Sequence, residues 1–178
     1  TIAGGGNCGS SCGDGDSAIQ AEIDYPQDVA VTTDGSVLIT DYSSSRIRRV
    51  GPDGIITTIA GGGNCLGSDC GDGGLATQAR LSSPEGITIT ADGYTLISDY
   101  SNRIRQVGLD GIITTIAGDG GRGFTGDGGP AIQAKLSVSE GIAVSMDGSI
   151  LIADTGNNRI RKVSSSLPGF SATDLAIA

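Results

Sequence analysis

The sequence of 178 residues contains no histidine and no tryptophan, and it holds only one methionine, two phenylalanines and four tyrosines. The absence of histidine removes the commonest general base and the usual protein ligand of zinc and copper. With so few aromatic side chains, a core must be built from isoleucine, valine, leucine and alanine. Histidine-dependent catalysis is therefore excluded for this chain.

Positive charge and long apolar runs are also scarce. Eleven basic residues stand against twenty acidic ones, which gives a net charge of −9. Such a chain repels nucleic-acid phosphates and anionic lipid headgroups, so we expect neither nucleic acid nor a membrane surface as a partner. No apolar run approaches the length that crosses a bilayer, and the first residues lack a basic segment followed by an apolar one. We therefore expect no membrane insertion.

Glycine, in contrast, is abundant, and one glycine-rich phrase is repeated. TIAGGGNC occurs at 1–8 and again at 58–65, and TIAG returns at 115–118, so the spacing is 57 residues each time. A fixed period of this length indicates a repeat architecture. We predict one repeat segment over 1–163, with units at about 1–57, 58–114 and 115–163. Because the sequence begins inside a repeated phrase, we expect it to be an excerpt of a longer polypeptide.

Short apolar runs recur inside each unit, and turn-forming residues separate them. In the third unit, two such runs flank Met146-Asp147-Gly148-Ser149, which predicts a hairpin because glycine supplies a positive φ at little cost. RIRKV at 159–163 follows a second turn cluster at 155–158. In the other units a fourth run, IITTIAG, is rich in β-branched residues that favour a strand. Each unit is therefore predicted to be a four-stranded antiparallel meander.

The run IITTIA does not alternate between apolar and polar residues, which indicates burial on both faces by neighbouring sheets. Four-stranded sheets arranged around an axis form a β-propeller, normally of about 4 to 8 blades. We predict an all-β fold with almost no helix: a partial β-propeller of about three four-stranded antiparallel blades. TIAG at 1–4 is expected to be the fourth strand of a blade otherwise missing from the chain. Residues 164–178 are expected to be a linker and the start of a further strand or blade.

The third unit carries a specific resemblance to a known family. Its text, TIAGDGGRGFTGDGGPAIQAKLSVSEGIAVSMDGSILIADTGNNRIRKV, resembles the long-unit version of the NHL repeat of β-propellers. The resemblance covers the chain up to about residue 163, and it is strongest to the secreted and teneurin-like members, which implies an extracellular or cell-surface location. The family also includes RNA-binding and protein-binding domains, bacterial sensor domains and a zinc-dependent peptide-amidating lyase, so the resemblance does not define the function.

Four cysteines depart from the repeat, two in each of the first two units: Cys8, Cys12, Cys65 and Cys70. The aligned positions of the third unit are Arg122 and Thr125, so both cysteines of a pair are absent together. This is expected of disulfides, and we predict that Cys8 bonds to Cys12 and Cys65 to Cys70 in an oxidising compartment. A four-cysteine zinc site is the alternative, although such sites usually have tighter spacings and bring both pairs together.

Three glycine–aspartate motifs, centred on Asp14, Asp72 and Asp127, invite a calcium hypothesis because carboxylates with glycine are common in calcium loops. Only the first motif places two carboxylates, Asp14 and Asp16, within reach of one ion. We favour a tight turn in which the aspartate accepts backbone N–H bonds. Calcium near Asp14 and Asp16 is the weaker alternative, and no other cofactor or metal is predicted.

An acid ends the second strand of each unit, and an arginine begins the third. Because the hairpin brings these positions together, we predict three ion pairs: Asp41 with Arg46, Asp99 with Arg103, and Asp154 with Arg159. A charge pair that recurs in every unit is expected to hold the hairpin rather than to catalyse a reaction. No catalytic residue is predicted.

Three further acids, Asp28, Glu85 and Glu140, lie at the start of the innermost predicted strands. They are candidates for lining the mouth of the propeller channel. A carboxylate cluster there could hold a metal, as in lactonase-like propellers. The same positions could instead only meet solvent at the entrance.

The long connections between units are predicted to share one face of the propeller with the turns between second and third strands, because a meander sends alternate turns to opposite faces. Candidate binding residues on this face are Tyr42, Tyr100, Asn102, Arg122, Phe124, Asn157 and Asn158. Elaborate loops on a rigid scaffold are where recognition tends to reside. We predict a non-catalytic extracellular module that scaffolds or recognises a protein or glycan through these loops.

Three blades leave two open edges, which proteins usually pair or cover. The missing blades could lie elsewhere in a longer chain, two copies could pair into six blades, or each copy could donate its first strand to the next in a head-to-tail filament. An excerpt of a larger propeller is favoured, and a structural filament is the second hypothesis. The third is a lactonase- or lyase-like enzyme with a metal held by the channel acids.

Overall fold

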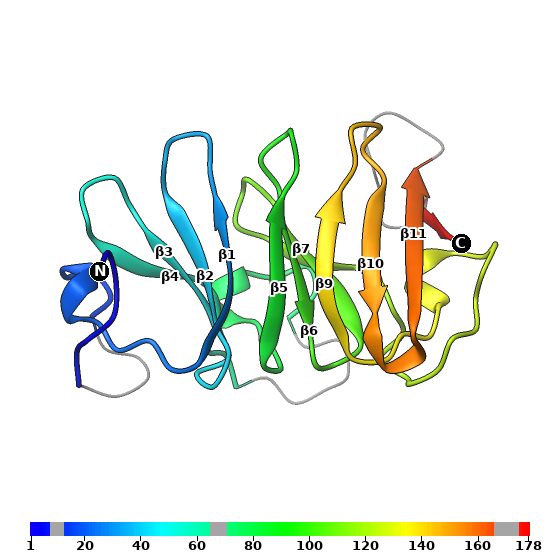
Figure 1. Ribbon diagram of the computed structural model, residues 1–178, viewed down its shortest axis with the longest axis horizontal. Coiled ribbons are helices and arrows are strands. Elements are labelled where there is room, and N and C mark those ends of the chain that lie inside the picture. The colour runs from blue at the N-terminus through cyan, green and yellow to red at the C-terminus, as the bar shows by residue number, and fades with distance from the viewer. Residues whose placement is uncertain (8–12, 65–70, 166–174) are drawn as a thin grey trace.

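The chain forms three separate four-stranded antiparallel sheets. The computed structural model describes residues 1–7, 13–64, 71–165 and 175–178. The strand orders are β1-β2-β3-β4, β5-β6-β7-β8 and β9-β10-β11-β12, and the sheets stand side by side along the longest axis of the molecule (Figure 1). Consecutive strands pair within each sheet, so every sheet is a meander. The predicted all-β fold, a partial propeller of three four-stranded blades, is confirmed.

The first sheet contains β1 (Pro26–Val31), β2 (Val37–Asp41), β3 (Arg46–Val50) and β4 (Ile56–Gly61). The second contains β5 (Pro84–Ile89), β6 (Thr95–Asp99), β7 (Arg103–Val107) and β8 (Ile113–Ala117). The third contains β9 (Ser139–Val144), β10 (Ile150–Asp154), β11 (Arg159–Ser165) and β12 (Leu175–Ile177). The only helical segments among the described residues are four short 3₁₀ turns: η1 (Ala18–Gln20), η2 (Ala76–Gln78), η3 (Ala131–Gln133) and η4 (Thr155–Asn157).

The first strands of the three sheets lie next to one another. β1 contacts β5, and β5 contacts β9, and Figure 1 shows these strands running in the same direction along the front of the molecule. The later strands of each sheet follow in chain order away from this row, and in the third sheet β10 and β11 lie beside β9 (Figure 1). This arrangement places the starts of β1, β5 and β9 at one edge and their first hairpin turns at the opposite edge.

Glycine shapes the first hairpin of each sheet. Gly35, Gly93 and Gly148 have φ values of 82°, 87° and 80°, a region that residues with a side chain rarely adopt. In the first hairpin the N–H of Gly35 donates to the carbonyl of Thr32, and the N–H of Thr32 donates to the carbonyl of Ser36. The same bonds recur in the other two hairpins, so the predicted turn at residues 146–149 is present.

The apolar core consists of layers between sheets. One layer packs Leu38 and Ile47 of the first sheet against Ile87 and Ile97 of the second. The next packs the second sheet against the third, and a smaller one packs residues 3–23 against the first sheet. The second sheet lies between the other two and is covered on both faces, so its strands carry apolar residues at successive positions.

The N-terminal end of the chain differs from the sequence-based expectation. TIAG forms the fourth strand in its second and third copies, as part of β4 and β8, but residues 1–4 form no strand. Instead, the N–H of Gly4 donates to the carbonyl of Ala18. At the other end, β12 pairs with β11 in the third sheet. The terminal segment therefore contains a further strand, one of the two alternatives expected for residues 164–178, and this strand is the fourth of the third sheet.

Candidate functional site

The long connections between sheets meet the turns between second and third strands at one edge of the molecule. The N–H of Val138 donates to Asn102 Oδ1 at 3.1 Å, and Asn102 Nδ2 donates to the carbonyl of Gly120 at 3.2 Å. In the third sheet, Asn157 Nδ2 donates to the carbonyl of Gly123 at 2.6 Å. These bonds tie the connection at residues 118–138 to the turns on either side of it. We call this edge the loop face.

Exposed aromatic and arginine side chains pair on the loop face. The guanidinium carbon of Arg122 lies 5.6 Å from the ring centre of Tyr100, and that of Arg159 lies 4.2 Å from the ring centre of Phe124. Both distances are within the range of cation–π attraction. Tyr100, Arg122 and Phe124, predicted as binding residues, are thus available to solvent.

The three predicted asparagines have different roles. Asn102 is buried and bonds to the backbone on both sides, and Asn157 bonds to Gly123 and to Asp154 Oδ2. Asn158 is exposed and has a φ of 54°, which suits a residue that reverses the chain. Asn102 and Asn157 therefore hold the connections of the loop face in place through hydrogen bonds to their backbone.

The predicted channel-mouth acids are brought together. Asp28, Glu85 and Glu140 line one cavity of about 560 Å³ together with Tyr25, Gln27, Tyr42 and Gly141. The rings of Tyr25 and Tyr42 lie 6.0 Å apart at 56°. Sequence reasoning did not select Tyr25, although its place before Pro26 marked the entry to the first strand. We call this cavity the acidic pocket.

The backbone and side chains around the acidic pocket also connect the sheets. The N–H of Ile87 donates to Asp28 Oδ2 at 2.9 Å, so this carboxylate bridges the first sheet to the second. The hydroxyls of Thr40 and Ser98 donate to the carbonyls of Glu85 and Glu140, at 3.1 Å each. The Asp28 carboxylate therefore also stabilises the contact between the first and second sheets.

The Glu85 carboxyl group is the least satisfied of the three. Its Oε2 atom is buried and accepts no hydrogen bond. Burial raises the pKa of Glu85, and the nearby charges of Glu140 and Asp99 raise it further. Within the described residues, no group of three or more histidine, cysteine, aspartate or glutamate side chains is arranged to hold a metal ion.

In the first and third sheets, the acid of the predicted hairpin ion pair lies near a different arginine from the predicted one. Asp41 lies opposite Arg46 in the strand register, but its carboxylate approaches Arg48 at 3.6 Å. Likewise Asp154 approaches Arg161 at 3.4 Å, and Arg159 donates instead to the carbonyl of Asn157. In the second sheet, burial raises the pKa of Asp99, and the charge of Arg105 is among the contacts that partly offset this rise.

This correction has a simple geometric cause. Residues two apart in a strand lie on the same face, so the second arginine of each Arg-Ile-Arg sequence is a diagonal neighbour of the acid and reaches it from deeper in the core. Arg48, Arg105 and Arg161 are all buried. The acids of the first and third sheets therefore approach Arg48 and Arg161 rather than the predicted Arg46 and Arg159, and the predicted pair of Asp99 with Arg103 stays a prediction.

The glycine–aspartate motifs supply a second carboxylate to the same buried arginines. Asp14 Oδ1 lies 2.8 Å from Arg48, and Asp72 and Asp127 pair with Arg105 and Arg161. Each arginine thus fastens the connection that precedes its own sheet. We call this arrangement the arginine staple. Asp14 has a protein partner here, whereas calcium binding near Asp14 and Asp16 stays an untested prediction.

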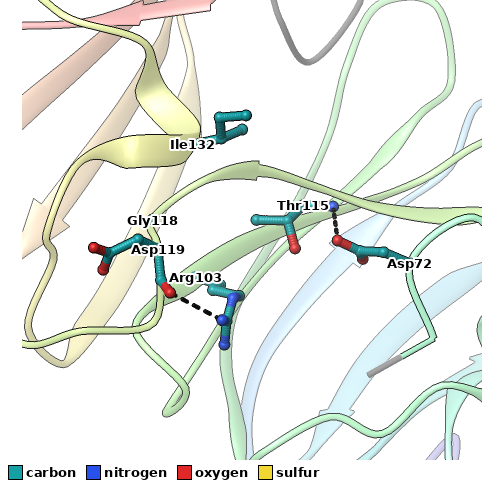
Figure 2. Close-up of a pocket in the computed structure, with 6 residues that line it drawn as sticks. All are labelled: Asp72, Arg103, Thr115, Gly118, Asp119 and Ile132. Carbon is teal, nitrogen blue, oxygen red and sulfur yellow. Dashed lines mark hydrogen bonds between the residues drawn. The ribbon is translucent and has the colours of Figure 1, made fainter. Parts of the chain in front are cut away.

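A second cavity, of about 410 Å³, lies where the second and third units meet and is drawn in Figure 2. Arg103 donates to the carbonyl of Asp119 at 3.0 Å, and the N–H of Thr115 donates to Asp72 at 3.1 Å. Gly118 and Ile132 complete the lining. Its polar groups mainly hold the connection at residues 118–138 against the second sheet.

The predicted disulfides of Cys8 with Cys12 and of Cys65 with Cys70 lie outside the described residues. They remain predictions. In the part of the chain that is described, no helix has the length and apolar character that a membrane span requires.

Comparison with protein families agrees with the repeat. The family described as Teneurin NHL domain matches residues 5–68 and 60–123, and the NHL repeat family matches residues 140–163. Teneurin-1 of Mus musculus is 30% identical over 176 residues, which cover 86% of this chain and 6% of that protein. The chain therefore spans only a small part of the curated relatives that it matches.

Solved structures share the fold at lower sequence identity. An auxiliary nutrient binding protein from Bacteroides ovatus superposes with a TM-score of 0.65 at 21% identity, over 83% of this chain and 39% of that one. Virginiamycin B lyase from Staphylococcus aureus superposes with a TM-score of 0.53 at 18% identity, over 85% of this chain and 40% of that one. Identities this low show a common fold and carry no statement about activity.

Proposed function

Because the chain belongs to the teneurin NHL domain family, we propose that it is a non-catalytic extracellular recognition module, part of a larger protein, that binds a protein or glycan through its loop face. One observation carries this proposal. Exposed Tyr100, Phe124 and Arg122 lie on a face whose connections are held in place by buried Asn102, partly buried Asn157 and the buried arginines of the arginine staple. Aromatic and arginine side chains on a rigid support are typical of binding surfaces.

The acidic pocket adds to the recognition surface. Three carboxyl groups and two tyrosines line it, and the chain has a net charge of −9. This charge favours partners whose contacting surface is basic, because opposite potentials steer the two molecules together. The pocket supports binding better than catalysis, since the described acids do not form a metal site.

A cell-binding experiment tests this proposal. Fluorescently labelled tetramers of the chain are applied to cells, and bound label is measured before and after treatment of the cells with trypsin or with glycosidases. We expect saturable binding that Tyr100→Ala and Phe124→Ala each weaken by about tenfold or more, because exposed aromatic anchors carry much of an interface's free energy. Loss after trypsin would identify a protein partner, and loss after glycosidase a glycan.

The matched control is Leu109→Ala. Leu109 is also a large exposed apolar residue, but it lies in the turn between β7 and β8, away from the loop face. This variant should bind as the unchanged chain does. Equal binding by all three variants, or no saturable binding at all, would contradict the proposal.

A further inference from the structure

The connection at residues 118–138 is the one link between sheets that the structure describes over its whole length. It differs from the connections of the first two units at its tip. Where those units carry Cys8 and Cys65, the aligned residue here is Arg122. The third unit therefore presents a positive charge at a position that is a cysteine in the other two.

Hydrogen bonds from both neighbouring sheets fix the backbone around Arg122. Asn102 Nδ2, from a turn of the second sheet, donates to the carbonyl of Gly120 at 3.2 Å. Asn157 Nδ2, from a turn of the third sheet, donates to the carbonyl of Gly123 at 2.6 Å. The chain is thus held on either side of Arg122. A group that is already held in place loses little conformational entropy when it binds a partner.

The Arg122 side chain exposes its N–H groups to solvent. Its backbone forms a β-bridge with buried Leu136, and its guanidinium carbon lies 5.6 Å from the ring centre of Tyr100. The ring covers one face of the guanidinium, whereas the N–H bonds lie in the guanidinium plane and point away from both faces. Within the described residues, these N–H groups donate no hydrogen bond.

Other exposed cations of the chain have a carboxylate partner. Arg49 and Lys162, on the edge opposite the loop face, pair with Asp34 at 2.9 Å and with Asp147 at 3.3 Å. Among the described residues, Arg122 forms no such ion pair, although the chain has twenty acidic residues and eleven basic ones. Its charge therefore remains available to an anion from outside the chain.

Two further charges lie near Arg122, and they are of opposite sign. The side chain of Lys135 runs beside Gly123 and ends near Gly121. The carboxylate of Asp119 accepts the N–H of Gly121 at 2.6 Å. Because these two charges offset each other, Arg122 decides the sign of the local charge at the tip of the connection.

The exposure of Arg122 and Tyr100 does not depend on the ends of the sequence. Tyr100 lies in the turn between β6 and β7, and Arg122 lies between the second and third sheets, which are both present. We assign no role to Arg159, because its equivalent in the second sheet, Arg103, is covered by the connection that follows that sheet. Arg103 is 8% exposed and donates to the carbonyl of Asp119 at 3.0 Å.

From these contacts we propose that Arg122, supported by Tyr100, binds a carboxylate of the partner, and that this carboxylate belongs to an acidic segment of a protein. The inference rests on the proposed function of the loop face and names the chemistry of the partner. A guanidinium is planar and matches a carboxylate through two parallel N–H···O bonds. Such charge-assisted bonds are stronger than bonds between neutral groups.

The acidic pocket favours a protein segment over a sulfated glycan. The pocket lies on the same face, since Tyr42 from a loop-face turn lines it together with Asp28, Glu85 and Glu140. A long polyanion that crosses the face is repelled by these carboxyl groups, whereas a short acidic segment contacts Arg122 alone. The partner surface is therefore mixed in charge, acidic opposite Arg122 and basic opposite the pocket.

Binding of labelled tetramers to cells, at about 0.15 M salt, tests this proposal through Arg122. Arg122→Gln should weaken saturable binding by about tenfold or more, because it removes the charge that pairs with the partner. Arg122→Lys keeps the charge but cannot form two parallel bonds, so we expect a loss of about threefold. Arg122 is exposed and its backbone contacts do not involve its side chain, so both variants should fold normally, which circular dichroism checks.

The matched control is Arg49→Gln, which removes the same charge on the opposite edge and should bind as the unchanged chain does. Unchanged binding by Arg122→Gln, alongside weakened binding by Tyr100→Ala and Phe124→Ala, overturns this inference and leaves the proposed function standing. Full binding by Arg122→Lys overturns the paired geometry. Absence of saturable binding by the unchanged chain overturns both proposals.

Competition with two soluble polyanions identifies the source of the anion. Excess poly-L-glutamate should displace the unchanged chain from cells and should displace Arg122→Gln far less at the same fractional occupancy. Heparin, a sulfated glycan, should compete less well than poly-L-glutamate of equal charge. Displacement by heparin but not by poly-L-glutamate would overturn the assignment to an acidic protein segment.

Discussion

The two sides of each sheet respond differently to the neighbouring unit. On one side, Arg105 of the second sheet and Arg161 of the third are both 2% exposed, although the third sheet stands at the end of the array. On the other side, Ile104 is 0% exposed and its counterpart Ile160 is 72% exposed. The arginine staple is completed by the connection that precedes its own sheet, whereas the side of a sheet that faces the next unit, which we call the forward face, is covered only by the following unit. A unit is therefore a sheet together with its preceding connection.

The largest expected effect tests whether the arginine staple belongs to a single unit. Arg105→Ala and Arg161→Ala should each lower the free energy of unfolding by about 3–5 kcal/mol, because each removes a buried cation whose charge favours a buried carboxylate, that of Asp99 or Asp154. Urea denaturation measures the loss. A much milder effect for Arg161→Ala would show that the staple depends on a following unit.

The control for this prediction is Arg49→Ala. Arg49 pairs with Asp34 at 2.9 Å, but both side chains are substantially exposed. Water and salt screen such a pair. We therefore expect no measurable change in the urea midpoint.

A smaller effect is expected on the forward faces. Leu96→Ala should lower the free energy of unfolding by about 3 kcal/mol, because it removes buried methyl groups and leaves a cavity between two sheets. Leu151→Ala, the same change one unit later, should cost less than about 1 kcal/mol when measured at a protein concentration where the chain is monomeric. Thermal unfolding at two protein concentrations checks both values. Equal losses in the two variants would mean that the third forward face is covered within one chain.

The smallest effect concerns Glu85 and Glu140, which occupy the same position in successive units. The pKa of Glu85 is raised in the folded chain, so the folded state retains a proton that the unfolded state has released. Stability is consequently present at low pH and falls as the pH rises from the usual carboxyl range to the raised pKa. Glu85→Gln should therefore stabilise the fold near neutral pH, by no more than about 1 kcal/mol because the open pocket admits screening solvent.

The pH profile distinguishes this cause from general effects of charge removal. The gain from Glu85→Gln should disappear below about pH 4, where the carboxyl group is protonated in both states. Glu140→Gln, at an exposed position, should give a smaller gain through the repulsion that it removes from Glu85. Asp92→Asn, at an exposed hairpin, is the control and should change the profile little. A stabilisation by Glu85→Gln that persists at low pH would contradict the assignment.

Local patterns predicted much of the fold. The β-branched run at residues 112–116 becomes most of β8, and Gly148 forms the hairpin turn that its neighbours predicted. Asp28, Glu85 and Glu140 line one pocket because all three lie near the starts of first strands, and these starts lie side by side in neighbouring sheets. The error over the ion pairs has the opposite origin. Proximity in sequence favoured Arg159, whereas the diagonal geometry across two strands selects Arg161.

The sequence by itself determined the repeat, the four-stranded unit and the residue types on each side of it, because strand and turn preferences act over a few neighbouring residues. Only the tertiary structure decided what becomes of equivalent residues. Asn102 is buried and its side chain bonds to the backbone of the next unit, whereas Asn158 is exposed. Leu96 lies in a core, while Leu151 is partly exposed to solvent. The physical reason is that burial depends on the presence of another sheet on the far side, which no local pattern encodes.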